Sequence, residues 1–318
     1  MSERVRHFRA LESGRIDRVV AAALPELSRA QARKLVEGGH VSVDGASVEK
    51  PAQEVAAGLD VRVELPVLPQ LDLLAADVPL EVLYEDEETL VIDKAPGLIV
   101  HPAPGIEGVT LVDVVRARYP EVREIDDSYR TGIVHRLDRD TSGVMALAKS
   151  AVAQDLMKDQ WREREPVKVY LAIAEGRMDP PDGIIEAPLG PDPSRPARRA
   201  VIEGGQSARS QFRTLEQFGD EAALLEVRIF TGRTHQIRVH LQAIGHPVLG
   251  DTMYGQASDV IGRQALHASR LTFTLASTGE TRTFEAPLPK DFASALETLR
   301  ARHAGDASEA VLEAGGTR

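Results

Sequence analysis

The chain has 318 residues, which is enough for about two domains with a substantial core. It contains no cysteine, which excludes a disulfide framework and thiolate chemistry and indicates a reducing, cytoplasmic setting. Its net charge of −11 argues against indiscriminate phosphate binding but allows a local basic face. The N-terminus is too charged for a signal peptide and the apolar runs are too short to cross a bilayer, so we expect a soluble protein without a membrane partner.

Residues 14–66 are expected to form one compact unit. A first helix is predicted up to Pro25, because apolar residues recur there at the spacing of one helix face: Ile16, Val19, Val20, Ala23 and Leu24. A second helix is predicted to begin at Ser28, a plausible N-cap, and to end at the glycines at 38 and 39. Two short strands follow, "HVSVDG" with its Asp-Gly turn and the alternating "VRVEL".

Several cationic side chains are expected on the outer side of these two helices. This set, called the basic face below, consists of Arg15, Arg18, Arg29, Arg33 and Lys34. Two helices with a cationic surface, followed by a small sheet, resemble the S-four-type RNA-binding domain. The alternative is a helical cap with solvated arginines. Residues 67–80 contain two prolines and are predicted to be a linker.

From residue 81 the pattern changes to strands. "LVIDKAPGLIVHP", "VYLAIAEG", "ALLEVRIF" and "LTFTLAS" are β-rich runs, and regular helical crossovers do not separate them. We therefore predict an α+β fold class: a small αα-β domain, then a domain at 81–300 with a large, mostly antiparallel mixed β-sheet flanked by helices and loops. Residues 301–318 are predicted to be a flexible tail.

Cofactor and metal sites have no visible signature. No Walker loop or G-x-G-x-x-G element follows a predicted strand. His235, His240 and His246 are spaced by five and six residues, which does not place them on one helix face. We therefore expect no cofactor and no metal.

The stretch "TGRTHQIRVHLQAIGHPVLGD" at 231–251 predicts a helix. Thr234 can cap its start, and Gly245 can end it. Arg233 then lies at the helix N-terminus, where backbone N–H groups already favour an anion. The alternative for Arg233 is a surface ion pair.

The stretch "GIVHRLDRDTSG" at 132–143 predicts a polar loop between two strands. In extended backbone, alternate residues point the same way. One side would carry Arg136, Asp138 and Asp140, and the other His135, Leu137 and Arg139. From the loop alone, turn hydrogen bonds are expected for Asp140 and a structural salt bridge for Asp138.

Four segments together resemble the RluA/RluD family of RNA pseudouridine synthases. They are "YEDEETLVIDKAPGLIVHP", "GIVHRLDRDTSGVMALAKS", "KVYLAIAEG" and "GRTHQIRVHLQAIGHPVLGD". H-R-L-D followed by T-S-G is the most specific of these signals. One departure is "KAPG" at 94–97, where the family often has K-P-A-G. The resemblance implies that 81–300 is the catalytic domain.

The resemblance also implies roles for particular residues. Asp138 matches the essential aspartate, acting as a nucleophile at the anomeric carbon or as a base that starts a glycal route. Arg233 matches the arginine that pairs with it. Tyr170 matches a tyrosine that stacks on uracil and whose hydroxyl is expected to help remove the proton from carbon 5. The expected RNA contacts are His135, Arg136, the loop at 193–200 and the basic face: Arg15, Arg18, Arg29, Arg33 and Lys34.

Within the resembled family, an N-terminal RNA-binding domain is typical of the enzymes that act on large-subunit ribosomal RNA, so that RNA is the expected substrate. Nothing in the sequence requires more than a monomer, which is the expected working form. Three alternatives stay open from sequence: a non-catalytic RNA-binding ribosome assembly factor, a nucleoside hydrolase that uses the same aspartate, and a synthase directed at tRNA.

Overall fold

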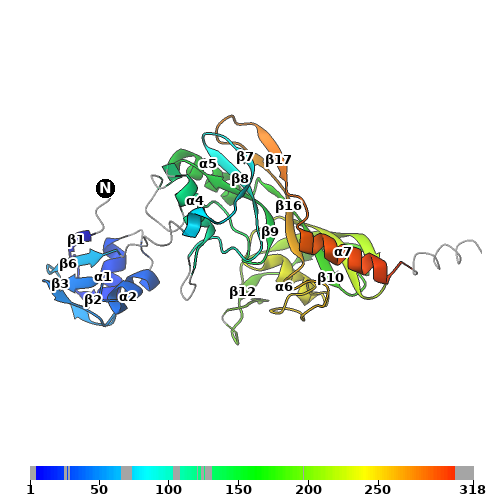
Figure 1. The fold of residues 1–318 in the computed structure, drawn as a ribbon. Coiled ribbons are helices and arrows are strands. Elements are labelled where there is room, and N and C mark those ends of the chain that lie inside the picture. Colours follow the sequence, from blue (N-terminus) through cyan, green and yellow to red (C-terminus); the bar gives the residue numbers. More distant parts are fainter. Residues whose placement is uncertain are drawn as a thin grey trace, which may run out of the picture. The chain divides into compact units, whose positions relative to one another are not determined.

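The computed structural model describes residues 5–24, 27, 29–65, 74–102, 108–119, 121–122, 125, 131–195 and 197–304. By their contacts these residues belong to two compact units (Figure 1). The first unit comprises Met1–Val78 and His101–Thr131, and the second comprises Pro79–Val100 and Gly132–Arg318. Half of the predicted linker, most of the predicted tail and the predicted cap Ser28 lie outside the described residues.

The first unit contains the small αα-β domain. Helices α1 (Ile16–Ala23) and α2 (Arg29–Glu37) share one apolar core with a sheet in the order β1-β6-β3-β4. The strands of this sheet are β1 (Val5–Arg9), β6 (Asp60–Glu64), β3 (Val41–Val43) and β4 (Ala46–Ser47). Strands β2 (Gly14–Arg15) and β5 (Glu54–Val55) pair separately, and helix α4 (Leu111–Arg118) also belongs to this unit.

Local sequence explains most of this domain. Ile16, Val20 and Leu24 are buried on one face of α1, as their spacing predicts. The Asp-Gly turn has φ of 47° at Asp44 and 82° at Gly45, which is the left-handed pair that a two-residue hairpin requires. Strand β1 was not predicted, because the polar sequence of β1 carries no clear alternation and its pairing with β6 depends on the tertiary structure.

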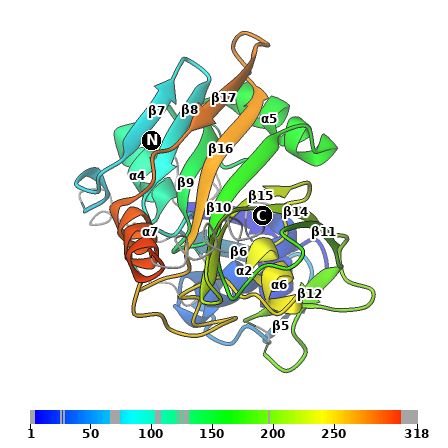
Figure 2. The same ribbon diagram turned by 90° about the vertical axis from the view of Figure 1, so that its right-hand side faces the viewer.

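The second unit is built on a large mixed sheet with the order β11-β14-β15-β10-β16-β9-β8-β7, and β17 pairs with β16 (Figure 2). Its strands are β7 (Glu81–Glu85), β8 (Thr89–Lys94), β9 (Ser142–Ala148), β10 (Val167–Glu175), β11 (Asp182–Glu186), β14 (Arg209–Phe218), β15 (Ala222–Ile229), β16 (Leu266–Thr274) and β17 (Thr281–Glu285). The β16–β9 pairing is parallel, and the other pairings in this sheet are antiparallel. The predicted α+β class with a mostly antiparallel mixed sheet is confirmed.

Helices and one small hairpin cover this sheet. Helix α5 (Ala151–Glu163), capped by the Ser150 side chain, buries Ala153 and Met157 against the core of β9 and β16. Helix α6 (Gln236–Ala243) packs through Val239 on the hairpin formed by β12 (Leu189–Pro191) and β13 (Arg199–Val201). Helix α7 (Lys290–Arg302) follows β17.

Gly143 brings the polar loop at 134–141 close to the middle of the sheet. Its φ is 113°, and a Cβ at this position would collide with the backbone carbonyl of Ala268 on β16. This is where β9 begins its parallel pairing with β16. The glycine of "TSG" is thus required by a close approach of two strands.

Candidate active site

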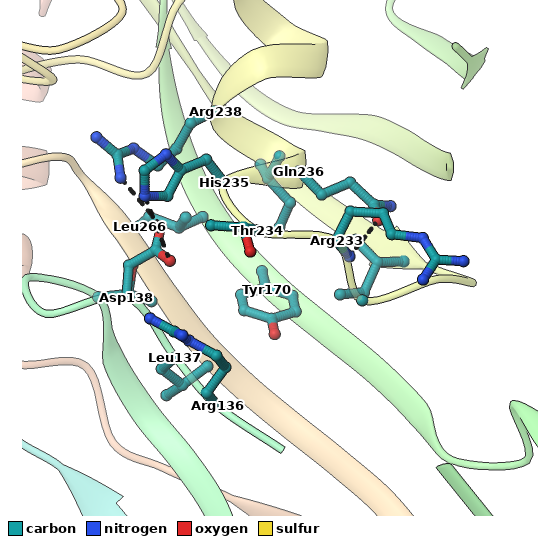
Figure 3. Close-up of a pocket in the computed structure, with 14 residues that line it drawn as sticks. Arg136, Leu137, Asp138, Tyr170, Arg233, Thr234, His235, Gln236, Arg238 and Leu266 are labelled. Carbon is teal, nitrogen blue, oxygen red and sulfur yellow. Dashed lines mark hydrogen bonds and ion pairs between the residues drawn. The ribbon is translucent and has the colours of Figure 1, made fainter. Parts of the chain in front are cut away.

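A pocket opens beside the loop at 134–141, between the sheet and the first turn of α6 (Figure 3). The loop contributes Arg136, Leu137 and Asp138 to its lining. The sheet contributes Tyr170 of β10, Ile229 of β15 and Leu266 of β16, and the segment at 232–238 contributes the remaining wall. Three segments that are distant in sequence therefore meet here.

The carboxylate of Asp138 forms an ion pair in this pocket with Arg238. The Arg238 Nη1 atom lies 3.0 Å from the Asp138 Oδ2 atom. The Arg238 side chain is only 6% exposed and that of Asp138 is 17% exposed. A charge-assisted bond in such surroundings is stronger than one in water.

A second carboxylate, that of Asp251, holds Arg238 in place. Arg238 donates from Nε to Asp251 Oδ2 at 2.6 Å and from Nη2 to Asp251 Oδ1 at 2.9 Å. Asp251 is itself buried, and its Oδ1 also accepts the backbone N–H groups of Met253 and Tyr254. Burial alone would lower the pKa of Arg238, but hydrogen bonds and charges from Asp251 and Asp138 outweigh it and raise that pKa. The guanidinium therefore stays charged and fixed in orientation.

The prediction that Arg233 pairs with Asp138 is wrong for this structure. Arg233 precedes α6, and its Nε donates to the backbone carbonyl of Ser207 at 3.0 Å. Figure 3 shows the two arginines on opposite sides of the pocket, with Arg238 facing Asp138. Both arginines belong to "GRTHQIR", so the motif alone does not show which of them pairs with Asp138. The structural difference is that Arg238 lies within α6 and Arg233 lies before it.

His235 is a further group near the aspartate that sequence reasoning did not assign. Its Nε2 atom lies 3.9 Å from Asp138 Oδ1, and its Nδ1 atom lies 2.8 Å from the Tyr254 hydroxyl. That hydroxyl accepts the backbone N–H of Arg199, so its own proton can be donated to Nδ1. We assign the His235 proton to Nε2 on this ground. Burial lowers the pKa of His235, although the charge of Asp138 opposes the shift.

Tyr170 lines the pocket from β10, as predicted, and is 8% exposed. Burial, reinforced by the charge of Asp138, raises the pKa of its hydroxyl. The phenol therefore stays protonated in the neutral pH range, which makes it a poor proton acceptor. Its ring remains available to a planar base.

Lys94 anchors the loop that carries Asp138, a role that the sequence did not reveal. Its buried ammonium donates to the backbone carbonyls of Ala95, Leu98 and Arg139 at 2.8, 2.9 and 2.9 Å. Burial lowers the pKa of Lys94 to about 7, against the opposing charges of Asp140 and Asp138. Lys94 thus binds the "KAPG" turn to the loop that carries Asp138. Alanine and proline stand in this turn in the reverse of the order that the family often has.

Three other polar residues of the loop that carries Asp138 differ from one another in burial and in their partners. His135, which the sequence assigns to RNA binding, instead accepts the backbone N–H of Ala146 at 2.9 Å and stacks on Trp161. Burial lowers its pKa to about 3, so the ring is neutral and structural. Arg136 is exposed at the pocket, and no carboxylate among the described residues pairs with it. Asp140, for which the loop predicts turn hydrogen bonds, instead forms an ion pair with Arg139 through its carboxylate.

The basic face is less basic than the sequence indicates. Arg15 and Arg29 both donate to the buried carboxylate of Asp17, at 3.1 and 3.2 Å, and Arg33 pairs with Glu37. Burial would raise the pKa of Asp17, but its hydrogen bonds to the two arginines outweigh burial and lower it. Arg18 is exposed, and the Lys34 side chain lies outside the described set.

Among the described residues, no helix combines the length and the apolar character that a bilayer-spanning helix needs. Within the same residues, no group of three or more His, Cys, Asp or Glu side chains is placed to hold a metal ion.

Known proteins resemble the chain over most of its length. A model of the RNA pseudouridylate synthase family matches residues 88–243, and a model of the S4 domain, the S-four-type domain named above, matches residues 14–61. An "Uncharacterized RNA pseudouridine synthase" from Chloroflexus aurantiacus is 44% identical over 290 residues, covering 91% of this chain and 90% of the relative. A "Ribosomal large subunit pseudouridine synthase D" from Nitrosomonas europaea is 38% identical over 296 residues, covering 90% and 84%.

Solved structures agree with these relatives. "Human RNA Pseudouridylate Synthase Domain Containing 1" is 26% identical with a TM-score of 0.55, and the match covers 70% of this chain and 95% of that one. Identity of about two-fifths over nine-tenths of the sequence makes this chain a member of the RluA/RluD family of RNA pseudouridine synthases, with an S4 domain in its N-terminal part.

Proposed function

We propose that this enzyme isomerises particular uridines of large-subunit ribosomal RNA to pseudouridine, without a cofactor, and that Asp138 supplies its essential catalytic carboxylate. The substrate class is supported by the names of relatives such as the Nitrosomonas europaea protein. The catalytic assignment depends on one observation above all. Asp138 is a carboxylate held at 3.0 Å by a buried guanidinium, in a pocket that also contains Tyr170.

The reaction exchanges one sugar–base bond for another. The bond from ribose C1′ to uracil N1 breaks, the base turns within the pocket, a bond from C1′ to C5 forms, the proton on C5 leaves, and N1 takes up a proton. Asp138 acts either as a nucleophile at C1′ or as the base that starts a glycal route. Both routes use the carboxylate form, which Arg238 contacts at 3.0 Å. Because Asp251 fixes the guanidinium, the carboxylate is oriented before substrate arrives.

Water must be kept away from C1′, because it would leave an abasic site. Leu137, Ile229 and Leu266 line the pocket around the aspartate and can exclude it. We assign Tyr170 to contact with the uracil face, since its protonated hydroxyl is a poor base. His235 faces the second oxygen of Asp138 from 3.9 Å, which is longer than a hydrogen bond, so we assign the orientation of that carboxylate to Arg238.

The target uridine must leave its stack to reach this pocket, which costs roughly a few kcal/mol. Contacts to RNA have to offset that cost. We propose Arg136 at the pocket for one of them, and the basic face of the S4 domain for others: Arg15, Arg18, Arg29, Arg33 and Lys34. The carboxylates of Asp17 and Glu37 reduce the net charge of this face, so Arg18 is its strongest candidate among the described side chains.

Tritium at C5 of uridine provides the direct test. Large-subunit ribosomal RNA transcribed with labelled uridine should release tritium to water without releasing uracil. Release of free uracil would indicate a hydrolase, and no release would indicate a binding protein. Mapping pseudouridines in ribosomal RNA and tRNA from cells lacking the protein would show which RNA loses the modification. If only tRNA loses it, the substrate proposal is wrong.

The basic face has its own test. Arg29→Glu combined with Arg33→Glu should weaken RNA binding, because it places two negative charges beside Asp17 and Glu37. Unchanged RNA affinity would remove the basic face from the proposal.

A further inference from the structure

A second hollow adjoins the catalytic pocket. It has a cavity volume of about 330 Å³, in the range of small-ligand sites. Its walls are the β12–β13 hairpin, the segment at 202–206 and two residues that precede α6, Arg233 and Thr234. Both of these residues also line the catalytic pocket, so the hollow, here called the hairpin groove, lies directly beside it.

The hairpin groove is cationic. Its charged lining residues are Arg199 and Arg233, and none of its lining residues is a carboxylate. Neither arginine forms an ion pair with a carboxylate in the part of the chain that the structure describes. Arginines on nearby β14 differ in this respect, since Arg209 pairs with Glu186 and Arg213 pairs with Glu226. In a chain with a net charge of −11, two unpaired guanidiniums in one groove form a local site for anions.

The groove is also held firmly beside the catalytic residues. The backbone N–H of Arg199 donates to the Tyr254 hydroxyl, which contacts His235. Arg233 uses Nε to bind the Ser207 carbonyl, and its two Nη groups bind no carboxylate of the described residues. Leu189 of the hairpin is buried against Val239 of α6, the helix that carries Arg238.

The remaining lining fits a nucleic acid strand. Ile202 gives the groove apolar surface, which suits a ribose or a base face. An arginine fork can bind two oxygens of one phosphate. A groove that combines unpaired arginines with apolar surface therefore suits a flexible, negatively charged nucleic acid strand better than it suits a free anion.

We propose that the hairpin groove binds the RNA strand on one side of the target uridine, with Arg199 and Arg233 on the phosphates nearest to it. This inference depends on the RNA pseudouridine synthase activity of the adjoining pocket, and it is independent of which RNA is modified. The groove then offsets part of the cost of extracting the base, and it sets the direction in which the strand enters.

Steady-state kinetics on labelled large-subunit ribosomal RNA tests this proposal. Arg199→Gln combined with Arg233→Gln should lower kcat/KM by about 10- to 100-fold near 150 mM salt, mainly through a higher KM. Because each single-stranded phosphate contact contributes about 0.7 to the slope of log affinity against log salt, that slope should fall by about 1.4. The matched control is Arg177→Gln with Arg228→Gln, which removes two exposed arginines outside both hollows and should change kcat/KM by less than about twofold.

Three results would overturn the proposal: a groove variant within twofold of the wild type, an equal loss in the control, or a fall in kcat at constant KM. Failure of the wild-type enzyme to release tritium would instead refute the proposed function, so the two failures are distinguishable.

Site-directed cross-linking gives a second test that does not depend on rates. The chain has no cysteine, so Gln206→Cys, at an exposed lining position of the groove, can carry a thiol-linked photo-cross-linker without background. In an Asp138→Asn background it should cross-link within a few nucleotides of the modified uridine. Asp220→Cys, in the exposed turn before β15, is the control and should not. Cross-links from position 206 that lie no closer to the target than those from position 220 would contradict the proposal.

Discussion

Replacing Arg238 by lysine tests the ion pair on which the proposed chemistry depends. Arg238 uses three nitrogens to bind two carboxylates, with distances of 2.6 and 2.9 Å to Asp251 and 3.0 Å to Asp138. A lysine keeps the positive charge, but a single ammonium on a flexible stem cannot reproduce this planar fork. We expect the ammonium to stay with Asp251, which is more deeply buried, and to leave Asp138 without its partner.

The size of the effect follows from the bond that is lost. A hydrogen bond to a charged group contributes about 1.5–3 kcal/mol. Each 1.36 kcal/mol is a factor of ten in rate, so kcat should fall by about 10- to 160-fold in Arg238→Lys. Arg238→Met should additionally lower the free energy of unfolding by about 3–5 kcal/mol, because it leaves two buried carboxylates without a cation.

Single-turnover tritium release at saturating RNA, with chemical denaturation of the same samples, provides both numbers. Arg300→Lys, which alters a surface ion pair with Glu216, is the control and should keep the wild-type kcat. Arg233→Lys should lower kcat at least ten times less than Arg238→Lys does. A larger loss of kcat in Arg233→Lys would show that the arginine before the helix, and not the one within it, serves Asp138.

Three further predictions concern the support of the site. Asp251→Asn should lower both kcat and the free energy of unfolding, the latter by about 3–5 kcal/mol, and wild-type values for both would exclude its role in holding Arg238. Burial lowers the pKa of Lys94 to about 7, so the unfolded chain binds its proton more tightly between pH 7 and 10.5. Lys94 should therefore make the free energy of unfolding rise with pH in that window, by at most about 1.4 kcal/mol per pH unit. Denaturation curves of Lys94→Met should lack this rise. Equal slopes of the free energy of unfolding against pH in the two proteins would contradict the prediction. Tyr170→Ala should weaken RNA binding by about 1–3 kcal/mol through lost stacking, whereas Tyr170→Phe should not, and equal losses in a binding titration would place the contact in the hydroxyl.

Periodicity and turn chemistry predicted much of the fold. The apolar stripe of α1, the Asp-Gly hairpin before β4 and the strand-rich pattern after residue 81 are local features, and each is found in the structure. The pairing of β1 with β6 and the single parallel pairing of β9 with β16 are contacts between distant segments, so no short window of sequence reports them.

The candidate site likewise has some features that local sequence predicts and others that depend on contacts between distant segments. Motif position placed Asp138 and Tyr170 in one pocket. Choosing the partner of Asp138 required knowing where α6 begins, since this decides which of two arginines in one motif faces the loop. The roles of Asp251 and Lys94 follow from hydrogen bonds to atoms that lie far away in sequence, including backbone carbonyls, and residue type alone does not indicate them.

The essential role of Asp138 is tested most directly by Asp138→Asn, assayed on labelled large-subunit ribosomal RNA. The substitution keeps the shape of the side chain and removes its charge. We expect the variant to bind RNA within about threefold of the wild-type affinity and to release no tritium above background over many wild-type turnover times. Tritium release near the wild-type rate from a correctly folded variant would contradict the proposed mechanism.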